Sequence, residues 1–127
     1  MSDEALSGKV LIVEDNDFVR MQIVRYLNTA GFETVEASDG GKALEIIDDK
    51  FNLAIVDVRM EPIDGFEFIK SLRGRNLPIP VILVTGDQNP DLLSEANKWS
   101  VSAVLMKPVQ KDRLIKMAAR AIQQAQK

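Results

Sequence analysis

Short apolar runs alternate along this 127-residue chain with longer stretches whose apolar residues recur at helical spacing. Most of the runs are bounded by polar or turn residues, which is typical of strands buried in a sheet. The run at 33–37 instead alternates apolar and polar residues, which indicates a less buried strand. The pattern predicts strands at 9–14, 33–37, 52–57, 81–85 and 103–107, and helices that begin near residues 18, 41, 66, 90 and 110.

Five strands that alternate with five helices predict a three-layer α/β domain, a doubly wound parallel sheet with helices on both faces. The connections between parallel strands are then right-handed. We expect a flexible leader at 1–8, the domain at 9–124, with its last helix ending near 124, and a frayed C-terminus at 125–127. A buried helix remains an alternative to the strand at 33–37.

Apolar residues assign an inward face to some of the helices. The first helix shows helical spacing of its apolar residues, and Gly31 is a fitting stop. These residues are Phe18, Met21, Val24 and Leu27, with Val19 and Ile23 flanking them. In the second helix, predicted from Gly41 to Lys50, the residues expected to point inward are Ala43, Leu44, Ile46 and Ile47.

Polar side chains stand at the carboxyl ends of four of the predicted strands. They are Glu14 and Asp15 after the first strand, Asp57 at the end of the third, Thr85 at the end of the fourth and Lys107 at the end of the fifth. The carboxyl ends of parallel strands meet at one edge of the sheet, where open α/β sheets place their ligand sites. We therefore expect these side chains to lie together.

Three carboxylates, a hydroxyl and an ammonium suit a divalent cation and a phosphoryl group. Mg²⁺ prefers oxygen and takes one or two carboxylates with water and phosphate oxygens, which fits Asp15 and Asp57, with Glu14 one water further out. Without a cation, acids this close repel one another and raise at least one pKa. A carboxylate also attacks phosphorus to form an acyl phosphate, whose charge Lys107 and Thr85 can neutralise. One strand-end Asp alone would more often be a turn residue; the joint pattern carries the prediction.

Composition narrows the functional classes. The chain has no cysteine and no histidine, which excludes disulfides, thiolate or imidazole metal ligands and Ser-His catalysis. Any phosphohistidine donor must therefore be another protein. A net charge of −3 argues against nucleic acid as a partner, because a phosphate backbone selects basic surfaces. The acidic start lacks the regions of a signal peptide, and no apolar run is long enough to span a bilayer, so we expect a cytoplasmic protein that does not bind membranes.

Four segments resemble the receiver domain of bacterial two-component response regulators, and the similarity covers residues 9–124. The segments are Val10–Asp15 (VLIVED), Ile55–Gly65 (IVDVRMEPIDG), Ile82–Gly86 (ILVTG) and Leu105–Pro108 (LMKP). Together they are highly specific, although each alone is weak. The resemblance implies a stand-alone, chemotaxis-type receiver with a flavodoxin-like fold and strand order 2-1-3-4-5.

The resemblance also implies roles for individual residues. Asp57 is expected to be the phosphoacceptor, and Glu14 and Asp15 the acidic pair that holds Mg²⁺. The backbone carbonyl of Arg59 falls at the third protein ligand position of the family.

Two further positions complete the implied site. Thr85 matches the hydroxyl that moves onto the phosphoryl group, and Lys107 matches its charge partner. Receiver domains also share a cis peptide bond after this lysine, so the Lys107–Pro108 bond is expected to be cis.

The chain departs from the family pattern at several positions. Val104 stands where an aromatic residue commonly rotates on activation, and Glu61 precedes Pro62 where the proline usually comes one place earlier. Arg59 and Asp87 hold the two positions that tune the phosphoryl lifetime, and their charges allow them to pair across the mouth of the site.

The expected output surface lies on the fourth helix, the fifth strand and the last helix. It includes Lys98 and Trp99, together with the switch position Val104. Since an exposed aromatic favours interfaces, Trp99 is a candidate anchor, although a single tryptophan more often packs half-buried.

The interpretation we favour is a Mg²⁺-dependent phosphoacceptor, not an enzyme apart from catalysing its own phosphorylation and dephosphorylation. A histidine kinase or histidine phosphotransfer protein would be the donor, and the output would be contact with an unknown downstream protein. The sequence does not separate a motor or adaptor ligand, a relay shuttle and a phosphate sink. Two alternatives are a phosphorylation-independent adaptor and an aspartyl-nucleophile phosphohydrolase. The hydrolase is disfavoured because such enzymes carry an acid two residues after the nucleophile, where this chain has Arg59.

Overall fold

The computed structural model describes residues 8–87 and 89–125, so the predicted leader, apart from Gly8, and residues 126–127 lie outside the described residues. One parallel sheet runs in the order β2-β1-β3-β4-β5. Its strands are β1 (Lys9–Val13), β2 (Glu33–Ala37), β3 (Leu53–Asp57), β4 (Val81–Thr85) and β5 (Ala103–Met106). The predicted fold and strand order are confirmed, including the strand at 33–37.

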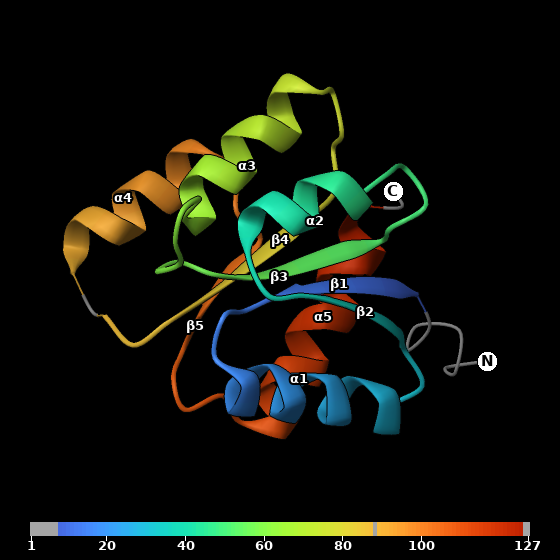
Figure 1. Ribbon diagram of the computed structural model, residues 1–127. Coiled ribbons are helices and arrows are strands. Elements are labelled where there is room, and N and C mark those ends of the chain that lie inside the picture. The colour runs from blue at the N-terminus through green and yellow to red at the C-terminus, as the bar shows by residue number, and fades with distance from the viewer. Residues whose placement is uncertain (1–7, 88, 126–127) are drawn as a thin grey trace.

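Helices cover both faces of this sheet in three layers (Figure 1). Two helices, α1 (Asp17–Thr29) and α5 (Lys111–Ala125), lie on one face. Three helices, α2 (Gly40–Ile46), α3 (Gly65–Gly74) and α4 (Pro90–Lys98), lie on the other. Helix α5 thus includes Ala125, the first residue of the predicted frayed end. Within the described part of the chain, no helix has both the length and the apolar character that crossing a membrane requires.

The two central strands are buried on both faces, which explains their continuous apolar runs. Because side chains alternate along a strand, Val56 and Leu83 pack toward α2, α3 and α4. Their neighbours Ile55 and Ile82 pack toward α1 and α5. The sheet therefore divides the core into two apolar layers and leaves its edge for polar groups.

The apolar residues whose spacing predicted α1 do not all face the core. Phe18 and Met21 are 80% and 53% exposed, whereas Ile23 and Leu27 are buried. A spacing of three residues drifts by about 60° per step on a helix of 3.6 residues per turn. The set that begins at Phe18 therefore winds halfway around α1, and only its later members reach the core.

Helix α2 is also shorter than predicted. It ends at Ile46, because Ile47 has the extended backbone of a C-cap residue. Ile47 is buried, but Ile46 is 40% exposed, so the inward orientation predicted for Ile46 is wrong.

Candidate functional site

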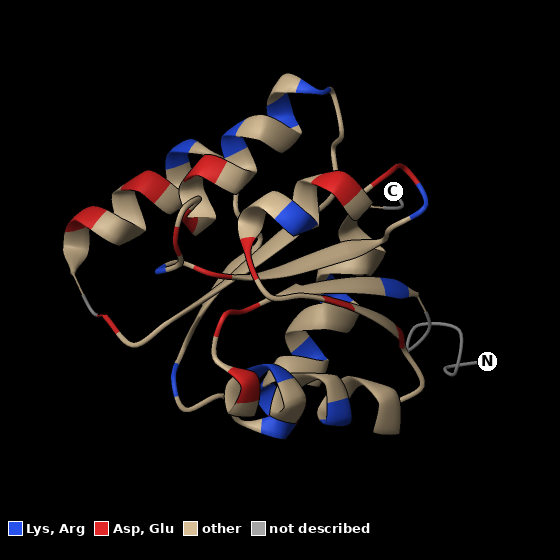
Figure 2. Cartoon of the chain, viewed as in Figure 1, with Lys and Arg blue, Asp and Glu red and all other residues tan. Residues whose placement is uncertain are grey.

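The strand ends bring the predicted acids together at the carboxyl edge of the sheet. Figure 2 shows acidic segments beyond β1 and at the end of β3, on the same side of the molecule. One carboxylate oxygen from each of Glu14, Asp15 and Asp57 lies within 4.8 Å of the other two. Glu14 and Asp57 are buried, whereas Asp15 is exposed. The cluster is therefore open to solvent on one side only.

Lys107 lies beside the two buried acids. Its Nζ is 3.2 Å from Glu14 Oε1 and 3.4 Å from Asp57 Oδ1. Burial by itself lowers the pKa of Lys107, but attraction to Glu14 and Asp57 outweighs it and raises the pKa above the ordinary value. The ammonium is thus kept charged next to Asp57. The Lys107–Pro108 bond is cis, as predicted, and Glu61–Pro62 is cis as well.

Glu14 remains incompletely satisfied even with this neighbour. Its Oε2 accepts a hydrogen bond from the backbone of Asn16, at 3.1 Å. Its Oε1 is buried and, among the described residues, accepts no well-formed hydrogen bond. Burial, and then the nearby Asp57, raise the pKa of Glu14 from 4.5 to about 7. The Lys107 ammonium is 3.2 Å from Glu14 Oε1, and a second cation beside the cluster would further favour the charged form of Glu14.

The loop after β3 borders the acid cluster. The backbone N–H of Arg59 donates to Asp57 Oδ1 at 3.3 Å, so the loop folds over the acid. A shallow hollow adjoins it, lined by Asp15, Val58, Arg59, Met60, Glu61 and Asp64. Carboxylate and carbonyl oxygens around an open hollow fit Mg²⁺, which keeps several of its waters.

Close packing of α3 fixes the backbone at Asp57. A Cβ on Gly65, the first residue of α3, would lie 2.6 Å from the carbonyl oxygen of Asp57. Only glycine permits this approach. The helix start is further fixed by a capping box, in which Asp64 and Glu67 each accept from the other's backbone N–H.

The predicted pair of Arg59 and Asp87 is confirmed as an ion pair across the mouth of the site. The hydrogen bond from Arg59 holds the pKa of Asp87 below its ordinary value. Asp87 also connects two neighbours: its N–H donates to Thr85 Oγ1 at 3.0 Å, and its Oδ1 accepts from Asn89 N at 3.1 Å. Asn89 is the N-cap of α4. The loop after β4 thus links the Thr85 hydroxyl to both Arg59 and α4.

The predicted output residues lie outside this cluster. Val104 is half-buried on β5, against the core layer under α2, α3 and α4. Trp99 follows α4 and is half-buried, with its Nε1 donating to Glu95 Oε2 at 2.9 Å. Lys70 and Lys98 place their ammonium groups 5.7 and 6.0 Å from the ring centroid. These contacts give Trp99 local partners, and its role in output stays a prediction.

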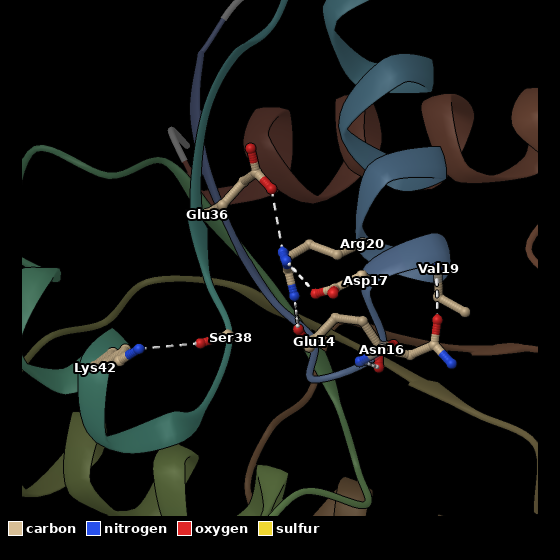
Figure 3. A network of polar contacts seen from close by, with 8 residues as sticks. All are labelled: Glu14, Asn16, Asp17, Val19, Arg20, Glu36, Ser38 and Lys42. Atoms are coloured by element: carbon tan, nitrogen blue, oxygen red, sulfur yellow. Dashed lines mark hydrogen bonds and ion pairs between the residues drawn. The ribbon is translucent and has the colours of Figure 1, made fainter.

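Arg20 was not singled out from the sequence. In the structure its guanidinium reaches Glu14, Asp17 and Glu36, which come from the β1–α1 loop, α1 and β2 (Figure 3). The i, i+3 spacing of Asp17 and Arg20 was visible in the sequence, but the contacts with Glu14 and Glu36 required the fold.

Comparison with known proteins agrees with this geometry. Residues 10–119 match the family described as response regulator receiver domain. The chain is 31% identical over 120 residues to the transcriptional regulatory protein FixJ of Bradyrhizobium diazoefficiens, covering 94% of this chain and 58% of FixJ. It is 33% identical over 109 residues to the transcriptional regulatory protein PdtaR of Mycobacterium tuberculosis, covering 84% of this chain and 53% of PdtaR.

Solved structures show the same fold. The chemotaxis protein CheY4 of Vibrio cholerae is 30% identical, with a TM-score of 0.80 and coverage of 91% of this chain and 98% of CheY4. The signal receiver domain of the putative response regulator NarL from Mycobacterium tuberculosis is 26% identical, with a TM-score of 0.86 and coverage of 92% and 97%.

The chain belongs to the response regulator receiver domain family. It spans at most 58% of the length of the first curated relatives that it matches.

Proposed function

We propose that Asp57 accepts a phosphoryl group from the phosphohistidine of a histidine kinase or histidine phosphotransfer protein. The observation that carries this proposal is a carboxylate, 5% exposed, which ends a central strand beside two further acids and has the Lys107 ammonium at 3.4 Å. If Asp57 had only a structural role, the ion pair with Lys107 would be enough to balance its charge. The additional crowding of Glu14 and Asp15 serves a cation.

In the proposed transfer, an Asp57 oxygen forms a bond to phosphorus while the phosphorus–nitrogen bond of the donor breaks. The imidazole keeps the electron pair of that bond and takes up a proton from solvent. Lys107 would neutralise the charge that spreads over the phosphoryl oxygens, and the Thr85 hydroxyl would donate a hydrogen bond to one of them. Hydrolysis of the acyl phosphate returns the free Asp57, so the chain catalyses only its own phosphorylation and dephosphorylation.

Asp15 and Asp57 would hold Mg²⁺ directly, together with the Arg59 carbonyl, and Glu14 would contribute through water. The ion, when bound, neutralises phosphoryl charge and orients the transferring group. Burial, and then the nearby Asp57, raise the pKa of Glu14 in the metal-free protein to about 7, and a cation beside Glu14 would favour its charged form.

The signal would pass on by protein contact. A phosphoryl group shifts the populations of two states only through contacts that differ between them. The loop from Thr85 to Asp87 would supply such contacts, because its hydrogen bonds connect the Thr85 hydroxyl to the N-cap of α4. With Val104 in place of an aromatic, the change would reach Lys98 and Trp99 mainly through this loop.

Intact mass tests the assignment. Wild type incubated with acetyl phosphate and Mg²⁺ should gain one phosphoryl mass, whereas Asp57→Asn should gain none. A comparable stable adduct on Asp57→Asn would overturn the assignment of the acceptor. An unmodified wild type would favour a phosphorylation-independent adaptor, and steady turnover of a generic phosphate ester would favour a phosphohydrolase.

A further inference from the structure

Arg20 joins three separate elements at one guanidinium. From α1, its Nη1 donates to the backbone oxygen of Glu14 at 2.8 Å, and its Nε donates to Glu36 Oε1 on β2 at 3.1 Å. Its Nη2 donates to Asp17 Oδ1 at 2.6 Å. The side chain is only 16% exposed, while those of Asp17 and Glu36 are 85% and 51% exposed. Figure 3 shows the fork of Arg20 between these acceptors.

The Glu14 oxygen is part of the peptide group that leads directly to Asp15. Other groups of Glu14 are held elsewhere: its N–H donates to Ala37 O at 3.1 Å, and its Oε2 accepts from Asn16 N at 3.1 Å. The contact with Arg20 is therefore the one that fixes the Glu14–Asp15 peptide group on its carbonyl side.

Asp15 depends on this peptide group more than the other two acids do. Its carboxylate is exposed and, within residues 8–87 and 89–125, accepts no hydrogen bond and forms no ion pair. Asp57, by contrast, is held by Lys107 and by the N–H of Arg59. The position of the Asp15 oxygens is thus set by the backbone that carries them.

We infer that Arg20 is a positioning residue of the metal site, which holds the Glu14–Asp15 peptide group so that the Asp15 carboxylate meets the cation. This inference rests on the proposed Mg²⁺ site. Groups that orient metal ligands are often as necessary for affinity as the ligands themselves. The positive charge of Arg20 is already balanced by its ion pairs with Asp17 and Glu36. Its proposed effect on the metal site therefore comes from the position of the Glu14–Asp15 peptide group and not from its charge.

The direction of the change in Mg²⁺ affinity distinguishes a positioning role of Arg20 from an effect of its charge. Arg20→Met keeps the length and the apolar stem of the side chain but removes all three hydrogen bonds. Loss of a positive charge near the acids would by itself tighten Mg²⁺ binding. We expect the opposite, a dissociation constant for Mg²⁺ that rises roughly tenfold, measured by titration of backbone amide chemical shifts.

Arg73 provides a matched control at the other end of the sheet. Its Nη1 donates to the backbone oxygens of Leu77 and Ile79, at 3.2 and 2.9 Å. Like Arg20, Arg73 therefore holds loop backbone through guanidinium hydrogen bonds. Arg73→Met should lower stability to urea while leaving the dissociation constant for Mg²⁺ unchanged. Arg20→Lys, which keeps the charge but loses the planar fork, serves as a second variant and should bind Mg²⁺ less tightly than wild type.

Amide hydrogen exchange in the metal-free protein supplies a readout that needs no cation. Arg20→Met should speed exchange at Asn16, whose N–H bonds to Glu14, without a matching change at Arg59. Wild-type Mg²⁺ affinity in both Arg20 variants would overturn the inference, as would an equal loss of affinity in Arg73→Met. A wild type that binds no Mg²⁺ would overturn the proposed metal site, and with it this role of Arg20.

Discussion

The amino and carboxyl edges of the sheet differ in how completely their polar groups are hydrogen-bonded. At the amino edge, Lys9 and Asn52 form two reciprocal hydrogen bonds. Lys9 N donates to Asn52 Oδ1 and Asn52 N donates to Lys9 O, both at 2.8 Å. At the carboxyl edge, Glu14 Oε1 is buried and, among the described residues, accepts no well-formed hydrogen bond, although the Lys107 ammonium is 3.2 Å away. The pKa of Glu14 is raised to about 7.

The buried polar groups are concentrated at the carboxyl edge. Buried polar groups are normally hydrogen-bonded, and an exception calls for a functional explanation. Among the described residues, the buried polar and charged ones are Glu14, Asp57 and Thr85, and all belong to the carboxyl edge. The polar groups of Lys9 and Asn52 at the amino edge are thus paired, whereas the acids at the carboxyl edge are crowded together, and a cation would relieve their repulsion.

The largest expected effect comes from the glycines at the two ends of α3. Gly65→Ala should lower the free energy of unfolding by about 3 kcal/mol, because its Cβ would lie 2.6 Å from the Asp57 oxygen. Gly74→Ala should raise it by about 0.5 kcal/mol, since that position is helical with nothing within 4 Å. Urea unfolding of both variants checks this. Equal changes in the free energy of unfolding for Gly65→Ala and Gly74→Ala would contradict this prediction.

The next effect concerns the pH dependence of metal-free stability. The pKa of Glu14 is 4.5 in the unfolded chain and about 7 in the folded protein. Between these values the folded state binds more protons, so stability is lost as the pH rises from 4.5 through 7. The shift corresponds to about 2 kcal/mol after allowance for coupling within the cluster.

Glu14→Gln should remove most of this loss and leave the protein more stable than wild type at pH 7.5, as measured by urea unfolding across this pH range. Lys9→Met, at the opposite edge of the sheet from the acid cluster, is the control. A wild type whose stability is flat from pH 4.5 to 7.5 would contradict the raised pKa.

A smaller effect is expected at the mouth of the site. Asp87→Asn should free Arg59 to pair with the phosphoryl oxygens, which shields the acyl phosphate from water and lengthens its lifetime several-fold. Arg59→Gln should shorten the lifetime relative to Asp87→Asn. Loss of phosphate after removal of the donor, followed by intact mass, gives both values. Identical lifetimes in wild type and the two variants would show that the ion pair has no part in tuning.

The smallest expected changes are those of the switch itself. Binding of beryllium fluoride with Mg²⁺ should shift backbone amide resonances in 85–106, including the start of α4 and Trp99. Thr85→Ala should weaken these shifts, because the hydroxyl that bonds Asp87 N is lost. Changes confined to 59–75 would instead indicate a different output face.

Much of the fold could be predicted because the strands carry their own signals. The continuous apolar runs of β3 and β4 and the polar residues that end them identified the sheet and the edge where the site lies. The resemblance to receiver domains singled out the positions two residues after Asp57 and two after Thr85, and the opposite charges of Arg59 and Asp87 there predicted that they pair.

Other features depend on distances that one sequence does not contain. The exposure of Phe18 could not be predicted from its spacing, because a three-residue spacing drifts around the helix and burial follows the side that faces the sheet. The contacts of Arg20 require α1 and β2 to lie side by side, which no local pattern specifies. The roles of Lys98, Trp99 and Val104 in output stay predictions for the same reason, since a partner surface is defined only with its partner.

Trapping the acyl phosphate tests the central claim most directly. Protein treated with acetyl phosphate and Mg²⁺ is reduced with borohydride, which converts an aspartyl phosphate to the corresponding alcohol, and the modified residue is located by peptide mass. The account predicts modification at Asp57 alone, and its loss when Mg²⁺ is chelated before the donor is added. Modification at Asp15 or Glu14, or labelling that is indifferent to Mg²⁺, would contradict the assignment of acceptor and metal ligands.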